Sequence, residues 1–189
     1  MTRLAFDRVA CLRGGRLLFE DLSLSLRAGE AALVTGANGA GKSSLLRLAA
    51  GLLGPGAGDI VRDGRVALAA EATALDDDSS LFAALIFWAR LDRQDDEAVA
   101  IALAAMGLAQ LAEVPVRLLS TGQRRRATIA RVIASGAPIW LLDEPASGLD
   151  AASLDALAGV MAGHRASGGI VLAASHQPIG LDGAQEVAL

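Results

Sequence analysis

The spacing of hydrophobic and polar residues changes several times along the chain, and each change predicts a different element. Residues 22–26 read LSLSL, an alternation of period two, which is typical of a strand with one buried and one wet face. We therefore expect an antiparallel pair of strands at residues 4–12 and 16–26. A third strand is expected at residues 31–35, which form a short apolar run.

Glycine-containing turns separate these strands from the next elements. A helix is expected to begin near Gly41 and to end at Gly51, because leucine and alanine recur at helical spacing between them. Two further strands are expected at residues 59–62 and 65–69. Asp-Gly is a favoured pair in tight hairpin turns, so a hairpin is predicted at residues 63–64 between these strands.

The second half of the chain alternates helical patterns with short apolar runs. The 3.6-residue period marks helices, and compact apolar runs mark buried strands. The expected helices are residues 81–90, residues 95–106, a segment that begins after Ser120, and residues 151–165. The expected buried strands are residues 139–142 and 170–174.

This order of elements predicts an α/β fold in which a helical block is inserted into a nucleotide-binding core. At 189 residues the chain is long enough for one sizeable domain and too short for two ordinary ones. We expect the core, together with an antiparallel β subdomain, to comprise residues 1–70 and 135–189. The helical subdomain is expected at residues 71–134.

Composition and charge narrow the possible functions. The formal net charge of −4 argues against a dedicated nucleic-acid binder, which is usually basic. The longest apolar run, residues 81–89, is about half of the ~20 residues that a bilayer span needs, and the N-terminus lacks the apolar stretch of a signal peptide. A single cysteine, Cys11, excludes an internal disulfide. We therefore expect a cytosolic protein that reaches a membrane only through partners.

Hydrophobic residues make up 53% of the chain, which is high. The sequence is compatible with an alanine-rich core and also with an apolar face that a partner covers.

A glycine-rich octet carries the strongest chemical signal. Residues 36–43 read GANGAGKS, which matches the pattern G-x-x-x-x-G-K-[ST] of the P-loop. Its lysine is the only one in the chain. A compact ammonium enters a tight ring of backbone N–H groups where a planar guanidinium does not. The expected phosphate-binding residues are Gly36, Ala37, Asn38, Gly39, Ala40, Gly41, Lys42, Ser43 and Ser44.

A pair of carboxylates ends the next buried strand. Asp143 and Glu144 follow the apolar residues 139–142, and Pro145 comes directly after them. Open α/β sheets bind ligands at the carboxyl ends of their strands, so Asp143 is expected beside Mg²⁺ and Glu144 beside the γ-phosphate of a nucleotide. The alternative is that an acidic pair merely ends a strand.

A third motif, LLSTGQRRR at residues 118–126, lies between the other two. Ser120 is expected to cap a helix whose N-terminal N–H groups face an anion, and Gly122 allows the backbone to approach a phosphate closely. The alternative is an ordinary capped helix with a solvated basic face. The motif resembles the LSGGQ signature of ATP-binding cassette (ABC) ATPases, with Thr121 in place of the first glycine.

Two shorter segments extend this resemblance. Residues 147–150, SGLD, resemble the D-loop of ABC ATPases, although Ala146 stands where the family commonly has threonine. His176 follows the last predicted buried strand and resembles the histidine of the H-loop. The resemblance covers essentially the whole chain and implies a P-loop NTPase with a RecA-like core.

The resemblance also implies a mechanism in which two subunits close head to tail around two ATP molecules. Ser43 would then ligate Mg²⁺, with Asp143 in the outer shell. Glu144 would polarise the attacking water, and His176 would contact the γ-phosphate. The signature residues Ser120, Gly122 and Gln123 would complete the ATP site of the opposite subunit.

Two positions depart from the family pattern. Arg13 stands near the place where family members carry an aromatic residue that stacks on adenine. Because a guanidinium also stacks on a base, our hypothesis is that Arg13 contacts adenine with weak base selectivity. Glu71 follows the strand predicted to end near Ala70, where the family has a glutamine that reaches towards Mg²⁺. Glu71 is either a solvated loop residue or a carboxylate near the metal.

Softer motifs resemble one group of ABC ATPases. The compact size, the segment CLRGGRLLF at residues 11–19 and the segment SHQP at residues 175–178 are similar to the ATPases of bacterial haem exporters in cytochrome c maturation. This resemblance implies separate transmembrane subunits and a peripheral location on the cytoplasmic face of the inner membrane. The acidic segments 76–78 and 95–97 are expected to be solvated surface, with partner docking as the alternative.

Three other functions compete with this interpretation. The ATPase of another small exporter would share every motif. A soluble ABC ATPase in DNA repair or translation usually carries a second cassette or a long coiled-coil insertion, and the sequence has neither. A module that senses ATP with weak turnover would not require both Glu144 and His176.

Overall fold

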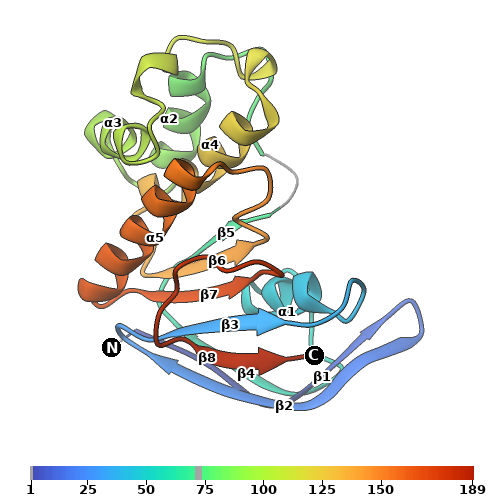
Figure 1. The fold of residues 1–189 in the computed structure, drawn as a ribbon. Coiled ribbons are helices and arrows are strands. Elements are labelled where there is room, and N and C mark those ends of the chain that lie inside the picture. Colours follow the sequence, from blue (N-terminus) through green and yellow to red (C-terminus); the bar gives the residue numbers. More distant parts are fainter. Residues whose placement is uncertain (1, 71–73) are drawn as a thin grey trace.

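The fold consists of two β-sheets and five α-helices in the part of the chain that the structure describes, residues 2–70 and 74–189 of a computed structural model. The first sheet is antiparallel, with strand order β2-β1-β4 (Figure 1). Its strands are β1 (Arg3–Arg13), β2 (Arg16–Arg27) and β4 (Ala57–Asp63). The predicted strands at residues 4–12 and 16–26 are confirmed, and Leu24 and Leu26 face the core while Ser23 and Ser25 are exposed.

The second sheet is parallel and has the strand order β5-β6-β7-β3-β8. Parallel strands end at the same edge, so the loops that follow β3, β6 and β7 meet there. Its strands are β3 (Ala31–Thr35), β5 (Val66–Ala69), β6 (Ile139–Asp143), β7 (Ile170–Ala174) and β8 (Gln185–Ala188). The predicted buried strands are confirmed, whereas β8 was not predicted because its four residues are mostly exposed and carry no apolar period.

The predicted hairpin at residues 63–64 is wrong. Strand β4 pairs with β1 in the antiparallel sheet, whereas β5 pairs with β6 in the parallel sheet. The reason is their different surfaces: β4 is mostly exposed, while Ala67 and Ala69 of β5 are buried. An almost wholly apolar strand is stabilised in a parallel sheet whose faces are covered rather than in a sheet with one wet face.

Side-chain caps define the starts of four helices. Ser80, Asp95, Ser120 and Asp150 each accept a hydrogen bond from the backbone N–H three residues later, as N-caps do. The predicted helices are confirmed, and each helix end that the sequence predicts lies within two residues of the observed end. Their bounds are α1 (Lys42–Ala49), α2 (Leu81–Leu91), α3 (Asp96–Ala105), α4 (Thr121–Ala134) and α5 (Ala151–Ala166).

The parallel sheet separates two hydrophobic clusters. One cluster lies between the two sheets, where Leu45, Leu46 and Leu48 of α1 are fully buried. The other lies on the opposite face and includes residues of α2, α3, α4 and α5; Figure 1 shows α2, α3 and α4 gathered at one end of the molecule. None of the helices that the structure describes is long and apolar enough to cross a membrane.

An aromatic stack joins α5 to the parallel sheet. The His164 ring lies 3.7 Å from the Trp140 ring, with 10° between their planes. A Cβ atom on Gly169 would lie 2.2 Å from this imidazole, so the ring also covers the start of the β7 segment. Burial lowers the pKa of His164, because a charged imidazolium would lose its hydration there.

This lowered pKa predicts a pH-dependent stability. As pH falls, the unfolded chain, with an ordinary histidine pKa of about 6.5, binds a proton at a higher pH than the folded protein does. The contribution of His164 is therefore present above pH ~6.5 and lost as pH falls through its folded pKa. We expect His164→Phe, which retains an aromatic ring against Trp140, to lose less stability than the wild type between about pH 7.5 and pH 5. Urea denaturation at several pH values tests this, and parallel curves for the two proteins would contradict it.

Candidate nucleotide-binding site

The P-loop connects the carboxyl end of β3 to the first turn of α1. The Nζ of Lys42 donates hydrogen bonds to the carbonyl oxygens of Gly36 at 2.8 Å and Ala37 at 3.3 Å, so the loop wraps around its own lysine. Gly41 has a φ of 116°, and a Cβ atom there would lie 3.1 Å from the Phe19 ring. Glycine is therefore required at position 41 both by the backbone conformation and by the close approach of β2.

A cavity of about 410 Å³ opens over this loop. It brings six of the nine predicted phosphate-binding residues together with one of the two predicted carboxylates, Glu144. This arrangement places a potential proton acceptor opposite the only lysine of the chain. The residues that line it are Leu18, Asn38, Gly39, Gly41, Lys42, Ser43, Ser44 and Glu144.

Asp143 is the buried carboxylate of the site. It is 8% exposed, and its Oδ1 atom has no hydrogen-bond partner among the described residues. Burial raises the pKa of Asp143, the neighbouring Ser43 hydroxyl opposes this shift, and the charge of Glu144 adds to it. A desolvated carboxylate with a free oxygen beside a serine hydroxyl is an oxygen-rich donor set of the kind that Mg²⁺ prefers. These residues therefore fit a magnesium ion.

Glu144 is held in an uncommon conformation at the end of β6. Its φ is 47°, which costs a non-glycine residue roughly 1–2 kcal/mol, and its backbone N–H donates to the carbonyl of Ala174 at 2.8 Å. The carboxylate lies 2.7 Å from Nδ1 of His176. The Nε2 of His176 lies 3.1 Å from the side-chain nitrogen Nε2 of Gln177. The two predicted catalytic residues, Glu144 and His176, are thus in direct contact.

The signature residues form a well-capped helix start. Ser120 and Gln123 make a capping box, in which the Ser120 hydroxyl accepts from the Gln123 N–H and the Gln123 side chain accepts from the Ser120 N–H. The expectation that Ser120 caps α4 is confirmed. A Cβ atom on Gly122 would lie 2.8 Å from the carbonyl oxygen of Gly148. Gly122 is therefore also needed for packing against residues 147–150 of the same chain.

Several predicted site residues lie apart from the P-loop cavity. Among the described residues, Ser120, Gly122 and Gln123 do not line it, and neither does Arg13. Arg13 is exposed at the end of β1, opposite Arg16 in the hairpin. Glu71 lies outside the described residues.

Two apolar residues of β2 were missed by sequence reasoning. Leu18 lines the cavity, and Phe19 contacts Gly41. The signal in the sequence was the presence of two large apolar residues, Leu18 and Phe19, between the polar residues Arg16 and Glu20 on one strand.

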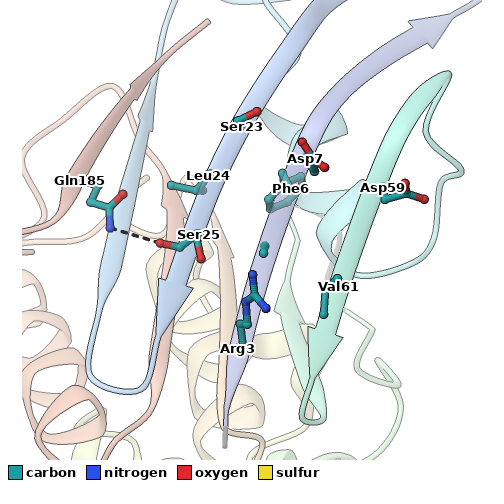
Figure 2. Close-up of a pocket in the computed structure, with 10 residues that line it drawn as sticks. Arg3, Phe6, Asp7, Ser23, Leu24, Ser25, Asp59, Val61 and Gln185 are labelled. Atoms are coloured by element: carbon teal, nitrogen blue, oxygen red, sulfur yellow. Dashed lines mark hydrogen bonds between the residues drawn. The ribbon is translucent and has the colours of Figure 1, made fainter.

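A larger concavity lies elsewhere, on the outer face of the antiparallel sheet (Figure 2). It has a volume of about 620 Å³, and its polar lining includes Arg3, Asp7, Ser25 and Asp59. Gln185 of β8 borders it and donates to the Ser25 carbonyl at 3.4 Å. It shares no lining residue with the P-loop cavity. Its charges are mixed and exposed, so it has the character of a solvated sheet surface.

Comparison with known proteins identifies close relatives of this chain. The protein family described as ABC transporter matches residues 19–147. A protein from Sphingopyxis alaskensis named cytochrome c biogenesis ATP-binding export protein CcmA is 59% identical over 98% of this chain and 96% of its own length. A protein of the same name from Novosphingobium aromaticivorans is 50% identical over 96% of this chain and 92% of its own length.

Solved structures share the fold. A structure described as an inward-facing conformation of a metal-chelate type ABC transporter superposes with a TM-score of 0.85 at 26% identity, over 100% of this chain and 79% of that chain. An ATP binding subunit of an ABC transporter superposes with a TM-score of 0.81 at 23% identity, over 92% and 79% of the two chains. The expected P-loop NTPase architecture is thereby confirmed. The chain belongs to the ABC transporter family.

Proposed function

We propose that this chain is the Mg²⁺-dependent ATP-hydrolysing subunit of an exporter that serves c-type cytochrome biogenesis, with haem export as its process. The observation that carries the proposal is the cavity that holds Lys42, Ser43 and Glu144 together. The relatives named for cytochrome c biogenesis, at 59% and 50% identity over nearly the whole chain, support the choice of exporter.

The P-loop binds the phosphates of ATP. Asn38, Gly39, Gly41, Lys42, Ser43 and Ser44 line the cavity, so their backbone N–H groups are the donors for phosphate oxygens. Lys42 exchanges its contacts with the carbonyls of Gly36 and Ala37 for phosphate oxygens. The Ser43 hydroxyl would ligate Mg²⁺, and Asp143, whose Oδ1 has no hydrogen-bond partner among the described residues, would stand in its outer shell. When bound, this ion neutralises charge on the β- and γ-phosphates.

Glu144 orients the attacking water and accepts its proton. A carboxylate is suited to this role when a neighbour holds it at a fixed angle. His176 supplies that restraint through Nδ1, and the Ala174 carbonyl fixes the backbone of Glu144. The strained φ of 47° directs the side chain into the cavity rather than along the strand.

A second subunit completes the site. Among the described residues, Ser120 and Gly122 do not line the cavity and lie at a separate helix start. The first N–H groups of a helix have no partner within it, so they bind anions readily. Two copies arranged head to tail bring Ser120, Gly122 and Gln123 of one subunit to the P-loop of the other.

A transmembrane subunit occupies a groove between the core and the helices. This groove has a volume of about 460 Å³ and includes Ala70, Ala74, Trp88 and Arg131 in its lining. Two of its leucines are strongly exposed, with Leu52 at 71% and Leu91 at 64%. Apolar groups gathered at such an edge mark a surface that a partner covers. We infer that the chain binds at the cytoplasmic face of the inner membrane through this partner.

Substitution of Lys42 by arginine tests whether the phosphate site requires the shape of lysine as well as its charge. Lys42→Arg keeps the positive charge but puts a planar fork into a space where Lys42 is only 7% exposed. We expect at least about a tenfold loss of ATP affinity or turnover, comparable to that of Lys42→Met. Binding of a fluorescent ATP analogue and phosphate release measure the two effects. An arginine variant with near-normal activity would contradict the proposed role.

Substitution of the carboxylate tests catalysis itself. Glu144→Gln keeps the size of the side chain but removes the proton acceptor, so we expect kcat to fall by about 100-fold or more while ATP affinity stays within a few-fold. Glu113→Gln, at an exposed position, is the matched control and should behave as the wild type. Equal ATPase rates for Glu144→Gln and the wild type would instead favour a module that binds ATP without genuine turnover.

A further inference from the structure

Three consecutive arginines follow the signature residues on α4, and each binds a different part of the chain. Arg124 contacts Asp77, in the loop before α2. Arg125 donates to the carbonyls of Ala70 and Asp143, both at 3.3 Å. Arg126 donates to the carbonyls of Met106 at 3.1 Å and Gly107 at 3.4 Å, beyond α3. The proposed nucleotide chemistry uses none of these contacts.

Arg124 links the loop before α2 to the start of α4. Its Nη1 lies 2.6 Å from Oδ1 of Asp77, and its Nε donates to the carbonyl of Leu119 at 3.3 Å. Leu119 directly precedes the N-cap Ser120. The Arg124 side chain, which is 28% exposed, therefore joins the loop to Leu119, the residue before the N-cap of α4.

The loop that carries Asp77 makes several polar contacts. Asp76 accepts a hydrogen bond from the Ser79 hydroxyl at 2.6 Å. Asp78 pairs with Arg117 at 3.0 Å, and the Arg117 N–H donates to the Asp77 carbonyl at 3.0 Å. These contacts thus join the loop to the short turn that leads into α4. The acidic segment at residues 76–78 is exposed, as expected of a solvated surface, and two of its carboxylates also pair with arginines.

The same loop begins at the proposed partner groove. Ala70 and Ala74 both line that groove, and Ala74 accepts a hydrogen bond from the Trp88 indole at 2.6 Å. A partner seated in the groove therefore touches the segment that leads to Asp77. Arg125 adds a second link, since it joins the end of β5 at Ala70 to the end of β6 at Asp143.

We propose that Arg124 and Asp77 are a positioning pair that transmits the position of the groove-side loop to the N-terminus of α4, and so to Ser120 and Gly122. The inference rests on the proposed function, because α4 affects hydrolysis only if its start completes the ATP site of a second subunit. An ion pair whose carboxylate side chain is 62% exposed adds little to folding stability. Its loss therefore acts on turnover and on subunit association rather than on the melting temperature.

A charge-swap experiment on the full chain tests this inference. The variants are Asp77→Arg, Arg124→Asp and the double swap, and Arg126→Ala is the control because it removes an arginine from the same helix without touching the loop. For each, Mg²⁺-ATPase activity is measured against protein concentration, together with ATP-analogue affinity and melting temperature. We expect each single swap to reduce kcat, or to raise the protein concentration for half-maximal activity, by about tenfold, a typical size for coupling between sites.

The other readouts separate positioning from a structural role. ATP-analogue affinity should stay within about twofold of the wild type, the melting temperature should change no more than in Arg126→Ala, and the double swap should recover most of the activity. Single swaps as active as Arg126→Ala, or a double swap no better than the single swaps, would overturn the inference and leave the ATPase function standing. A wild-type chain without Mg²⁺-ATPase activity would overturn the proposed function and the inference with it.

Discussion

The site depends on the register of three neighbouring parallel strands. Asp143 of β6 pairs with Ala174 of β7, and Val34 of β3 pairs with the same residue from the other side. The backbone continues this ladder beyond the strand ends, since the Glu144 N–H donates to the Ala174 carbonyl and the Ser175 N–H donates to the Val34 carbonyl. A slip of one residue would send every side chain to the opposite face of the sheet. This register therefore sets the P-loop, the carboxylates and His176 at one edge.

The packed core keeps the Asp143 carboxylate desolvated and holds the Glu144 backbone in a strained conformation at this edge. Asp143 is kept nearly dry beside Ser43, and Glu144, at a positive φ, donates a backbone hydrogen bond to Ala174 and accepts one from Ser147. Both states persist because β6 is buried along its whole length. Strained and desolvated groups survive only where the surrounding structure over-determines them, and here the two hydrophobic clusters on either face of the sheet do so.

The fold puts the signature residues and the P-loop at the starts of two different helices. Ser120 begins a helix that packs with α2 and α3, whereas Lys42 begins a helix that packs between the sheets. The arginines of α4 join these regions through backbone carbonyls and one carboxylate, Asp77. Long basic side chains on a helix surface can span such distances while their stems cover apolar neighbours. These polar contacts add to the hydrophobic cluster that the helices share with the parallel sheet.

Local rules in the sequence determined most of the elements and the chemistry of the P-loop. Helix caps, strand periods and the octet at residues 36–43 act within a few residues, so the N-cap at Ser120 and the strand at Ala31–Thr35 follow from the chain itself. Only the tertiary structure decided the separation of β4 from β5, the contact of Phe19 with Gly41 and the pairing of Arg124 with Asp77. These depend on which distant surfaces bury one another, and that is set by packing of the whole domain rather than by neighbouring residues.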